Sequence, residues 1–204
     1  MLVDPSGTDS YIFYVNDNFR IFGVLMDYIT LMLSDRCLPW QVHLVSVSNY
    51  DDFKSEWNKM NGDIQTVIIS SHGDPTRLCW QDYSLIVDSS GASKLTPKNI
   101  ARIIITGCNA GHLDYEKTNV PAAFAKLQYG SSTKVIASDG TVTNWPIPRI
   151  LGSANNEIFK GYLTKGDRDN KGWMIYTSAD GKNVTTKSLS SKKSLSMSEM
   201  LRLI

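Results

Sequence analysis

Apolar and polar positions follow two alternating patterns over roughly the first two thirds of the chain. Short apolar runs rich in β-branched and aromatic residues predict buried strands, and the segments between them, with apolar residues at helical spacing, predict helices. Strands that alternate with helices are typical of βαβ units, which build a parallel sheet covered on both faces. The pattern therefore predicts an α/β fold with a mostly parallel central sheet, whose strands are 11–15, 41–47, 66–70, 102–106 and 134–137.

Capping and turn residues set the expected ends of the other elements. Asp17 or Asn18 is a good cap for the first helix, and Asn61-Gly62 ends the second. Thr96 followed by Pro97 predicts the start of a short helix. The expected helices are 18–33, 50–60, one opening at 96–97 and one starting near 118–121, with a hairpin or short excursion at 78–87.

The pattern changes after Gly140. A hairpin is expected from Trp173 to Leu189 around Asp180-Gly181, as an edge or cap element, and a short helix over 195–203. We expect a single domain, with a core over 1–142 and a small C-terminal hairpin element and terminal helix in 143–204.

Composition narrows the classes of partner. The 21 Lys and Arg residues nearly balance the 20 Asp and Glu residues, so nothing favours nucleic acid or an anionic membrane as partner. No apolar run is long enough to span a bilayer, and the first residues do not resemble a signal peptide, so a soluble chain is expected. Its 204 residues fit one α/β domain, which stands alone or is a fragment of a longer protein. These patterns predict neither a compartment nor an oligomeric state.

Two of the predicted strands end in a reactive side chain. His72 precedes Gly73 after the third strand, and Cys108 follows Gly107 after the fourth. Catalytic groups in open parallel sheets gather outside the carboxyl ends of the strands. If these two strands are neighbours, about 4.8 Å apart, their terminal side chains can share one substrate carbonyl. The pair therefore predicts nucleophilic catalysis by a thiol.

Each member of the pair has a definite chemical role. The Cys108 thiolate attacks the carbonyl carbon, and His72 protonates the leaving amine and then activates water. The backbone amides of Gly73 and Cys108 are the expected donors to the oxyanion. The predicted substrate is a peptide or protein, and the chemistry calls for neither a metal nor a cofactor.

The two motifs, VIISSHG at 67–73 and IIITGCNAG at 103–111, resemble those of the caspase-like cysteine peptidases. That clan holds caspases, clostripain, gingipains, separase and the self-processing protease domains of bacterial toxins. The resemblance covers roughly 11–140. It implies a caspase-like three-layer sandwich and hydrolysis on the carboxyl side of one selected residue, by an enzyme that processes its own chain or serves as a module of a larger protein.

The sequence departs from particular families of the clan near Cys108. The caspase pattern Gln-Ala-Cys is absent, which argues against cleavage after Asp. Relatives that cut after Arg, Lys or Asn can carry an acidic residue where Thr106 stands, so Thr106, Asp139 and Trp145 are candidate pocket residues. Selectivity remains open between a basic and a small apolar side chain.

The same residues are consistent with other interpretations. Cys108 alone is consistent with a buried packing thiol, as expected for Cys37 and Cys79, and His72 with a turn histidine bonded to backbone. His43 is expected on a strand face. Cys108 and His72 could also form a zinc cluster with Cys79 and His112, but the irregular spacing of these four residues argues against it.

Two other functional classes compete with a peptidase. A glutaminase-type amidotransferase would need glycines where Thr106 and Ala110 stand. A catalytically inactive caspase-like binding module would keep the fold without turnover. The lysines at 182, 187, 192 and 193 match a polyphosphate site of some toxin relatives but fit a solvated surface better.

Overall fold

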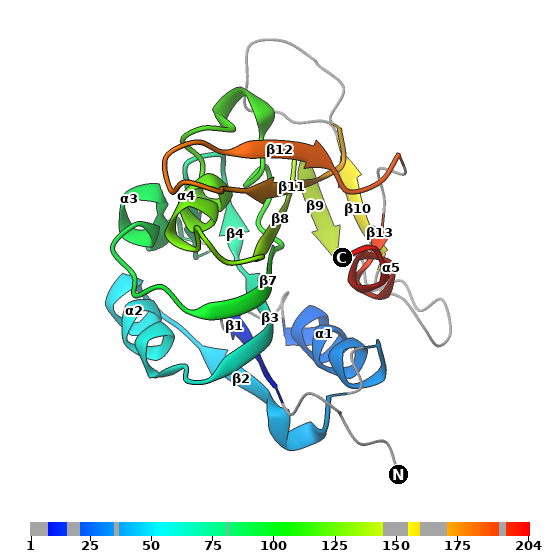
Figure 1. Cartoon of the computed structure of the whole chain (residues 1–204). Helices are drawn as coiled ribbons and strands as arrows, with labels where there is room; N and C mark the ends of the chain where they lie inside the picture. The colour runs from blue at the N-terminus through cyan, green and yellow to red at the C-terminus, as the bar shows by residue number, and fades with distance from the viewer. Residues whose placement is uncertain are drawn as a thin grey trace.

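The computed structural model describes residues 8–15, 21–34, 37–80, 82–144, 155–159, 171–191 and 195–204. Within these residues, seven strands form a central sheet in the order β12-β11-β8-β7-β3-β1-β2 (Figure 1). The neighbouring strands β8, β7, β3, β1 and β2 pair in parallel. Strands β11 and β12 are added in antiparallel orientation at the β8 edge. Their bounds are β1 Asp9–Tyr14, β2 Val42–Ser46, β3 Asp63–Ser70, β7 Asn99–Ile105, β8 Lys134–Ser138, β11 Trp173–Thr177 and β12 Thr185–Ser188.

Helices cover both faces of this sheet, as Figure 1 shows. One face packs against α2 (Tyr50–Lys59), α3 (Ser89–Ala92) and α4 (Val120–Leu127), and the other packs against α1 (Ile21–Ser34) and α5 (Met197–Leu203). Strand alternation sends neighbouring side chains to opposite faces, so that Ile103 and Ile105 join the first core and Ile104 joins the second. The predicted α/β class with a mostly parallel sheet and helices on both faces is confirmed.

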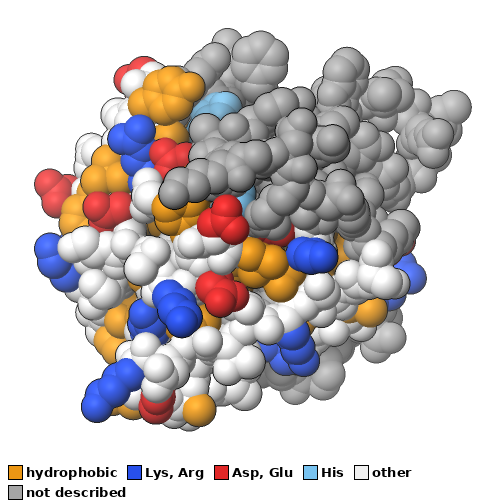
Figure 2. Space-filling model, turned by 90° about the horizontal axis from the view of Figure 1, so that it is seen from above, with side chains coloured by type: hydrophobic (Ala, Val, Ile, Leu, Met, Phe, Trp, Pro, Cys, Tyr) orange, Lys and Arg blue, Asp and Glu red, His pale blue; other side chains and the backbone are white. Residues whose placement is uncertain are grey.

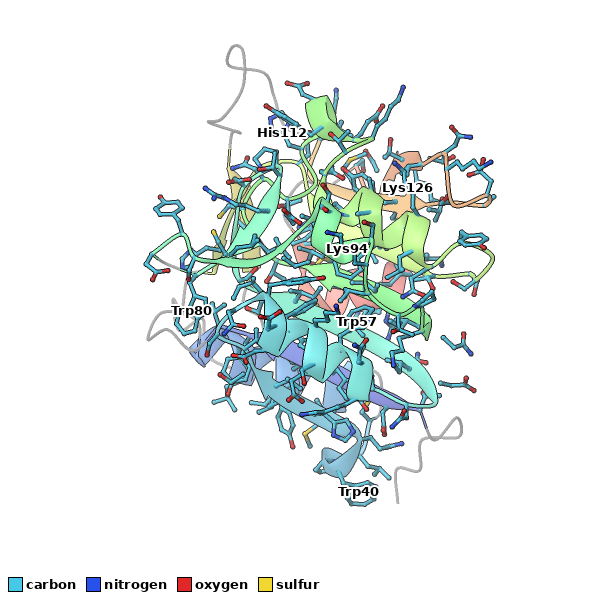
Figure 3. The ribbon with its side chains drawn as sticks, turned by 90° about the vertical axis from the view of Figure 1, so that its left-hand side faces the viewer. Trp40, Trp57, Trp80, Lys94, His112 and Lys126 are labelled. Atoms are coloured by element: carbon cyan, nitrogen blue, oxygen red, sulfur yellow. The ribbon has the colours of Figure 1, made fainter. Side chains whose placement is uncertain are left out.

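The larger core is built around aromatic side chains of α2. Trp57 points from α2 toward the sheet (Figure 3) and stacks at tilted angles near Phe13, Phe53 and Phe124. Its indole N–H donates to the carbonyl of Thr96 at 2.9 Å, which fixes the segment leading into β7.

The prediction of a helix that begins at Thr96-Pro97 is wrong. The short helix of this region, α3, begins earlier at Ser89, where the Asp88 side chain accepts the backbone N–H of Gly91. Thr96 and Pro97 instead lead into β7 as extended chain. The capping pattern near 118–121 is confirmed, because Asn119 caps α4 through the N–H of Ala122.

Two small antiparallel sheets stand at the carboxyl ends of the central strands. One contains β4 (His72–Gly73), β5 (Arg77–Cys79) and β6 (Leu85–Asp88), which confirms an excursion within 78–87. The other contains β9 (Thr141–Asn144), β10 (Asn155–Phe159) and β13 (Leu195–Ser196). Short 3₁₀ helices occur as η1 (Pro39–Gln41) and η2 (Leu113–Tyr115).

The predicted C-terminal hairpin and terminal helix are both present in the structure. The predicted hairpin at 173–189 is β11 and β12, and it extends the central sheet along its edge. The predicted terminal helix is α5, which packs beside α1. None of the helices within the described ranges has the length and apolar character needed to cross a membrane.

Candidate active site

The carboxyl ends of β3 and β7 lie side by side. The two strands pair in parallel up to Ile69 and Ile105, and the Thr106 N–H donates to the Ile69 carbonyl at 3.0 Å beyond the last paired residue. The register offset of 36 residues that relates these strands also relates His72 to Cys108. The expected adjacency of the two strands is therefore confirmed.

Beyond the strand ends, the two loops touch through their backbones. A Cβ atom built on Gly73 would lie 3.2 Å from the Cα of Gly107 and 3.3 Å from the carbonyl oxygen of Cys108. Such distances are tighter than ordinary van der Waals contact, so only glycine lets the chains approach this closely. The glycines beside His72 and Cys108 thus bring the two candidate catalytic segments together.

Cys108 differs from the other two cysteines in its surroundings. Its side chain is partly exposed, whereas Cys37 and Cys79 are buried, as expected for packing thiols. The Cys108 thiol donates to the carbonyl oxygen of Val142 in β9 at 3.3 Å. The sulfur therefore lies between the end of β7 and the start of the β9 sheet, within reach of solvent.

The loop that carries Cys108 is tied to the end of β8. Ser138 donates its hydroxyl to the carbonyl of Gly107 at 3.2 Å, and the backbone N–H of Asn109 donates to Gly140 at 2.7 Å. The N–H of Gly111 donates to the carbonyl of Ser138 at 2.8 Å. Because these bonds act on both sides of Cys108, the position of the thiol depends on β8.

The backbone around the predicted oxyanion donors, Gly73 and Cys108, lies in the β4–β5 hairpin and in the loop after β7. Asp74 N–H donates to the Arg77 carbonyl at 3.0 Å, which makes this a hydrogen-bonded pair of the β4–β5 hairpin. Bonded and non-bonded pairs alternate in antiparallel ladders, so the Gly73 N–H points away from β5. No backbone carbonyl among the described residues is found to accept the Cys108 N–H.

Two of the three candidate pocket residues, Thr106 and Asp139, contact backbone groups of the protein itself. The Thr106 side chain is buried, with its hydroxyl 3.5 Å from the Ile69 carbonyl. Asp139 is fully buried, and its two oxygens accept the backbone N–H groups of Leu113 and Lys171 at 2.9 and 2.8 Å. Both oxygens are therefore engaged by backbone, which argues against Asp139 as a pocket residue. Trp145 lies outside the described residues.

The remaining histidines have structural partners. His112 is fully buried, caps η2 by accepting the N–H of Asp114, and lies 3.9 Å from Asp139 (Figure 3). His43 stacks on Tyr11 at the β1–β2 edge. Among the residues that the structure describes, no group of three or more His, Cys, Asp or Glu side chains is placed to hold a metal.

Asp74 organises the turn that follows His72. Asp74 accepts the backbone N–H and hydroxyl of Thr76 at 2.7 Å each, and the Arg77 guanidinium at 3.0 Å. Burial works to raise the pKa of Asp74, but the hydrogen bonds from Thr76 and Arg77 and the charge of Arg77 hold it below 3.8. Asp74 therefore closes the β4–β5 hairpin that presents His72 and Gly73.

This lowered pKa predicts an acid-sensitive hairpin. A carboxyl with a depressed pKa stabilises the folded state fully above its unfolded pKa, and the stabilisation is lost as the pH falls through the depressed value. We expect Asp74→Asn to lower the melting temperature at pH 7, and the difference from wild type to shrink below about pH 4. Thermal melts followed by circular dichroism between pH 7 and 2 measure this. A difference independent of pH would show that the charge of Asp74 contributes nothing.

No protein-family model matches the chain, and no curated protein matches it in sequence. Function must therefore be inferred from the site itself.

Proposed function

We propose that the protein is a cysteine endopeptidase with a caspase-like fold, which hydrolyses peptide bonds through a His72–Cys108 dyad. One observation carries the proposal: His72 and Cys108 each follow the end of one of two neighbouring parallel strands, and the segments beyond these strands touch at Gly73 and Gly107 beside a partly exposed thiol. Packing alone does not require a histidine and a cysteine to follow adjacent strand ends in this way.

The proposed reaction has two steps. The Cys108 thiolate bonds to the substrate carbonyl carbon, the C–N bond breaks, and the His72 imidazolium gives its proton to the leaving amine. His72 then takes a proton from water, whose oxygen bonds to the thioester carbonyl carbon as the C–S bond breaks. The products are an amine, a carboxylic acid and the regenerated dyad.

The backbone amides of Gly73 and Cys108 support this chemistry. During each step, negative charge develops on the carbonyl oxygen of the substrate. The Gly73 N–H points away from β5 by the alternation of the hairpin, and no described backbone carbonyl is found to accept the Cys108 N–H. Preorganised donors of this kind typically contribute about 10²–10³ in rate.

The charge balance suits a protein substrate rather than a polyanion. Figure 2 shows acidic, basic and hydrophobic side chains interspersed over the described part of the surface on the β12 side of the molecule. No field of a single sign covers this side, in keeping with the net charge of +1. A protein substrate, including the chain itself or the larger protein of which it is a module, is in keeping with this balance.

Selective alkylation of Cys108 tests the proposal. Iodoacetamide is expected to modify Cys108 faster than Cys37 and Cys79, because the latter are buried, and His72→Ala is expected to slow this reaction. Mass spectrometry of tryptic peptides locates the label, and parallel incubation with a peptide library reports cleavage. Cys37→Ala is the matched control.

The competing function is an inactive caspase-like binding module. It predicts a Cys108 whose alkylation does not depend on His72 and no cleavage across the library. That result would remove the peptidase and retain the module.

A further inference from the structure

The face of the central sheet covered by α1 and α5 changes character near Cys108. One register row across five strands is entirely isoleucine and buried: Ile12, Ile68, Ile104, Ile136 and Ile175. Side chains two positions further along a strand return to the same face. The next row toward the carboxyl ends therefore consists of Tyr14, Ser70, Thr106, Ser138 and Trp173, all able to form hydrogen bonds.

We call these five residues the polar row. Tyr14 pairs directly with Ser70, and Ser138 pairs directly with Trp173. The bond from the Thr106 N–H to Ile69 continues the β3–β7 ladder, so that Thr106 stands between Ser70 and Ser138. The change from isoleucine to polar side chains thus occurs in one step on each of these five strands.

Two members of the polar row have unmet hydrogen-bonding capacity. The Ser70 hydroxyl and the Trp173 indole N–H are buried and have no partner among the described residues. The Thr106 hydroxyl has a 3.5 Å contact with Ile69, whereas Ser138 bonds to Gly107 and Gly140. Leaving a buried polar group unpaired destabilises the folded state. Buried polar groups normally have partners, so a hydrogen-bonding ligand would relieve this cost.

The polar row lies beneath the nucleophile. Thr106 is two residues before Cys108, which is about 7 Å along an extended chain. Cys108 packs against the same core cluster as the isoleucine row, so it is on the same face. Tyr14 and Cys108 are both partly exposed and flank the buried Ser70. A substrate side chain next to the attacked carbonyl would therefore meet this row.

The chemistry of the row selects a class of side chain. No member carries a charge, so the row itself supplies no counter-charge to a charged substrate side chain. Asp27 of α1, the helix that covers this face, is buried and has a partner of its own. Arg102, further down the same face, already bonds to Thr66, and Asp139 accepts two backbone N–H groups. An aliphatic side chain would leave Ser70 and Trp173 unpaired. A carboxamide supplies an acceptor for the indole N–H and both kinds of partner for a hydroxyl.

We propose that the polar row is the floor of the primary specificity pocket and selects Asn or Gln on the acyl side of the cleaved bond. This inference rests on the proposed peptidase function. The sequence left open a basic or a small apolar substrate side chain, and the row favours neither. It has no carboxylate to pair with a basic side chain, and a small apolar side chain would leave its polar groups unpaired.

Peptides that differ only in the selected residue test the proposal. The wild type is expected to cleave an Asn peptide at least about tenfold better in kcat/KM than its near-isosteric Leu counterpart, since one hydrogen bond contributes about 1.4 kcal/mol. Ser70→Ala and Thr106→Val should each reduce that ratio by up to about tenfold, and a ratio unchanged in both variants would contradict the proposal. Ser70→Asp should shift the preference toward Lys and Arg.

Ser10→Ala is the matched control. Ser10 is a buried serine on β1, at the opposite end of that strand from Tyr14, with its hydroxyl 3.6 Å from the Cys37 sulfur. Its replacement should leave the Asn-to-Leu ratio unchanged, and thermal melts confirm that each variant is folded.

The outcomes separate this inference from the peptidase proposal. Cleavage with a preference for Leu or Arg that Ser70→Ala does not alter would overturn the inference and leave the peptidase intact. If nothing is cleaved, calorimetry with the Cys108→Ala variant decides. Tighter binding of the Asn peptide that disappears in Ser70→Ala supports the polar row as a binding site, and the absence of binding overturns both proposals.

Discussion

Replacing Cys108 by alanine is expected to reduce kcat/KM for peptide hydrolysis by a factor on the order of 10⁴ or more. Without the sulfur no thioester forms, and water would have to attack the amide directly. His72→Ala should cause a loss of similar size, because the leaving amine then has no proton donor. The measurement is fluorogenic peptide cleavage under second-order conditions, with each variant checked by circular dichroism.

The double variant sharpens this prediction. Residues that act as one catalytic unit show strongly non-additive effects, so Cys108→Ala with His72→Ala should be little worse than either change alone. Cys37→Ala, which removes a buried thiol near Ser10, should retain activity. Cleavage that survives both catalytic substitutions would rule out the dyad.

Gly111→Ala is expected to destabilise the fold and displace the nucleophile loop. A Cβ atom at this position would lie 2.9 Å from the carbonyl carbon and oxygen of Ala137, which are backbone atoms of β8 and cannot rotate away. Overpacking of this kind costs about 1–3 kcal/mol. The same shift should weaken the bond from the Gly111 N–H to Ser138 and so reduce the rate of Cys108 alkylation.

Urea unfolding and the alkylation rate together measure this effect. Gly130→Asn is the control, because Gly130 has a φ of +77° that Asn tolerates and a Cβ there would meet nothing within 4 Å. A Gly111→Ala protein with wild-type stability and wild-type alkylation rate would show that the contact with β8 does not position Cys108.

Both predictions depend on the end of β8 as much as on the dyad itself. Ser138, Gly140 and the β9 residue Val142 all bond to the loop that contains Cys108. Nothing in the local sequence near Cys108 identifies these partners. If the peptidase proposal holds, they determine where the thiol stands relative to the substrate carbonyl.

The pattern of the sequence was enough to predict the parallel core and the adjacency of the two strands that His72 and Cys108 follow. Residues 66–70 and 102–106 are short β-branched runs that must be buried, and the sequence shows directly that His72 and Cys108 follow them. The spacing of apolar residues and the direction of the chain can both be read from the local sequence. They indicate which residues form strands and which reactive side chains follow the carboxyl end of a strand.

Tertiary structure alone decided the rest. It placed α3 at Ser89 instead of Thr96, joined β11 and β12 to the central sheet, and engaged Asp139 with the N–H groups of Leu113 and Lys171. It also aligned Ser70 with Thr106 and Tyr14. Backbone hydrogen bonds between distant segments determine these arrangements, and such bonds can be made by any residue type, so they leave no local trace in the sequence.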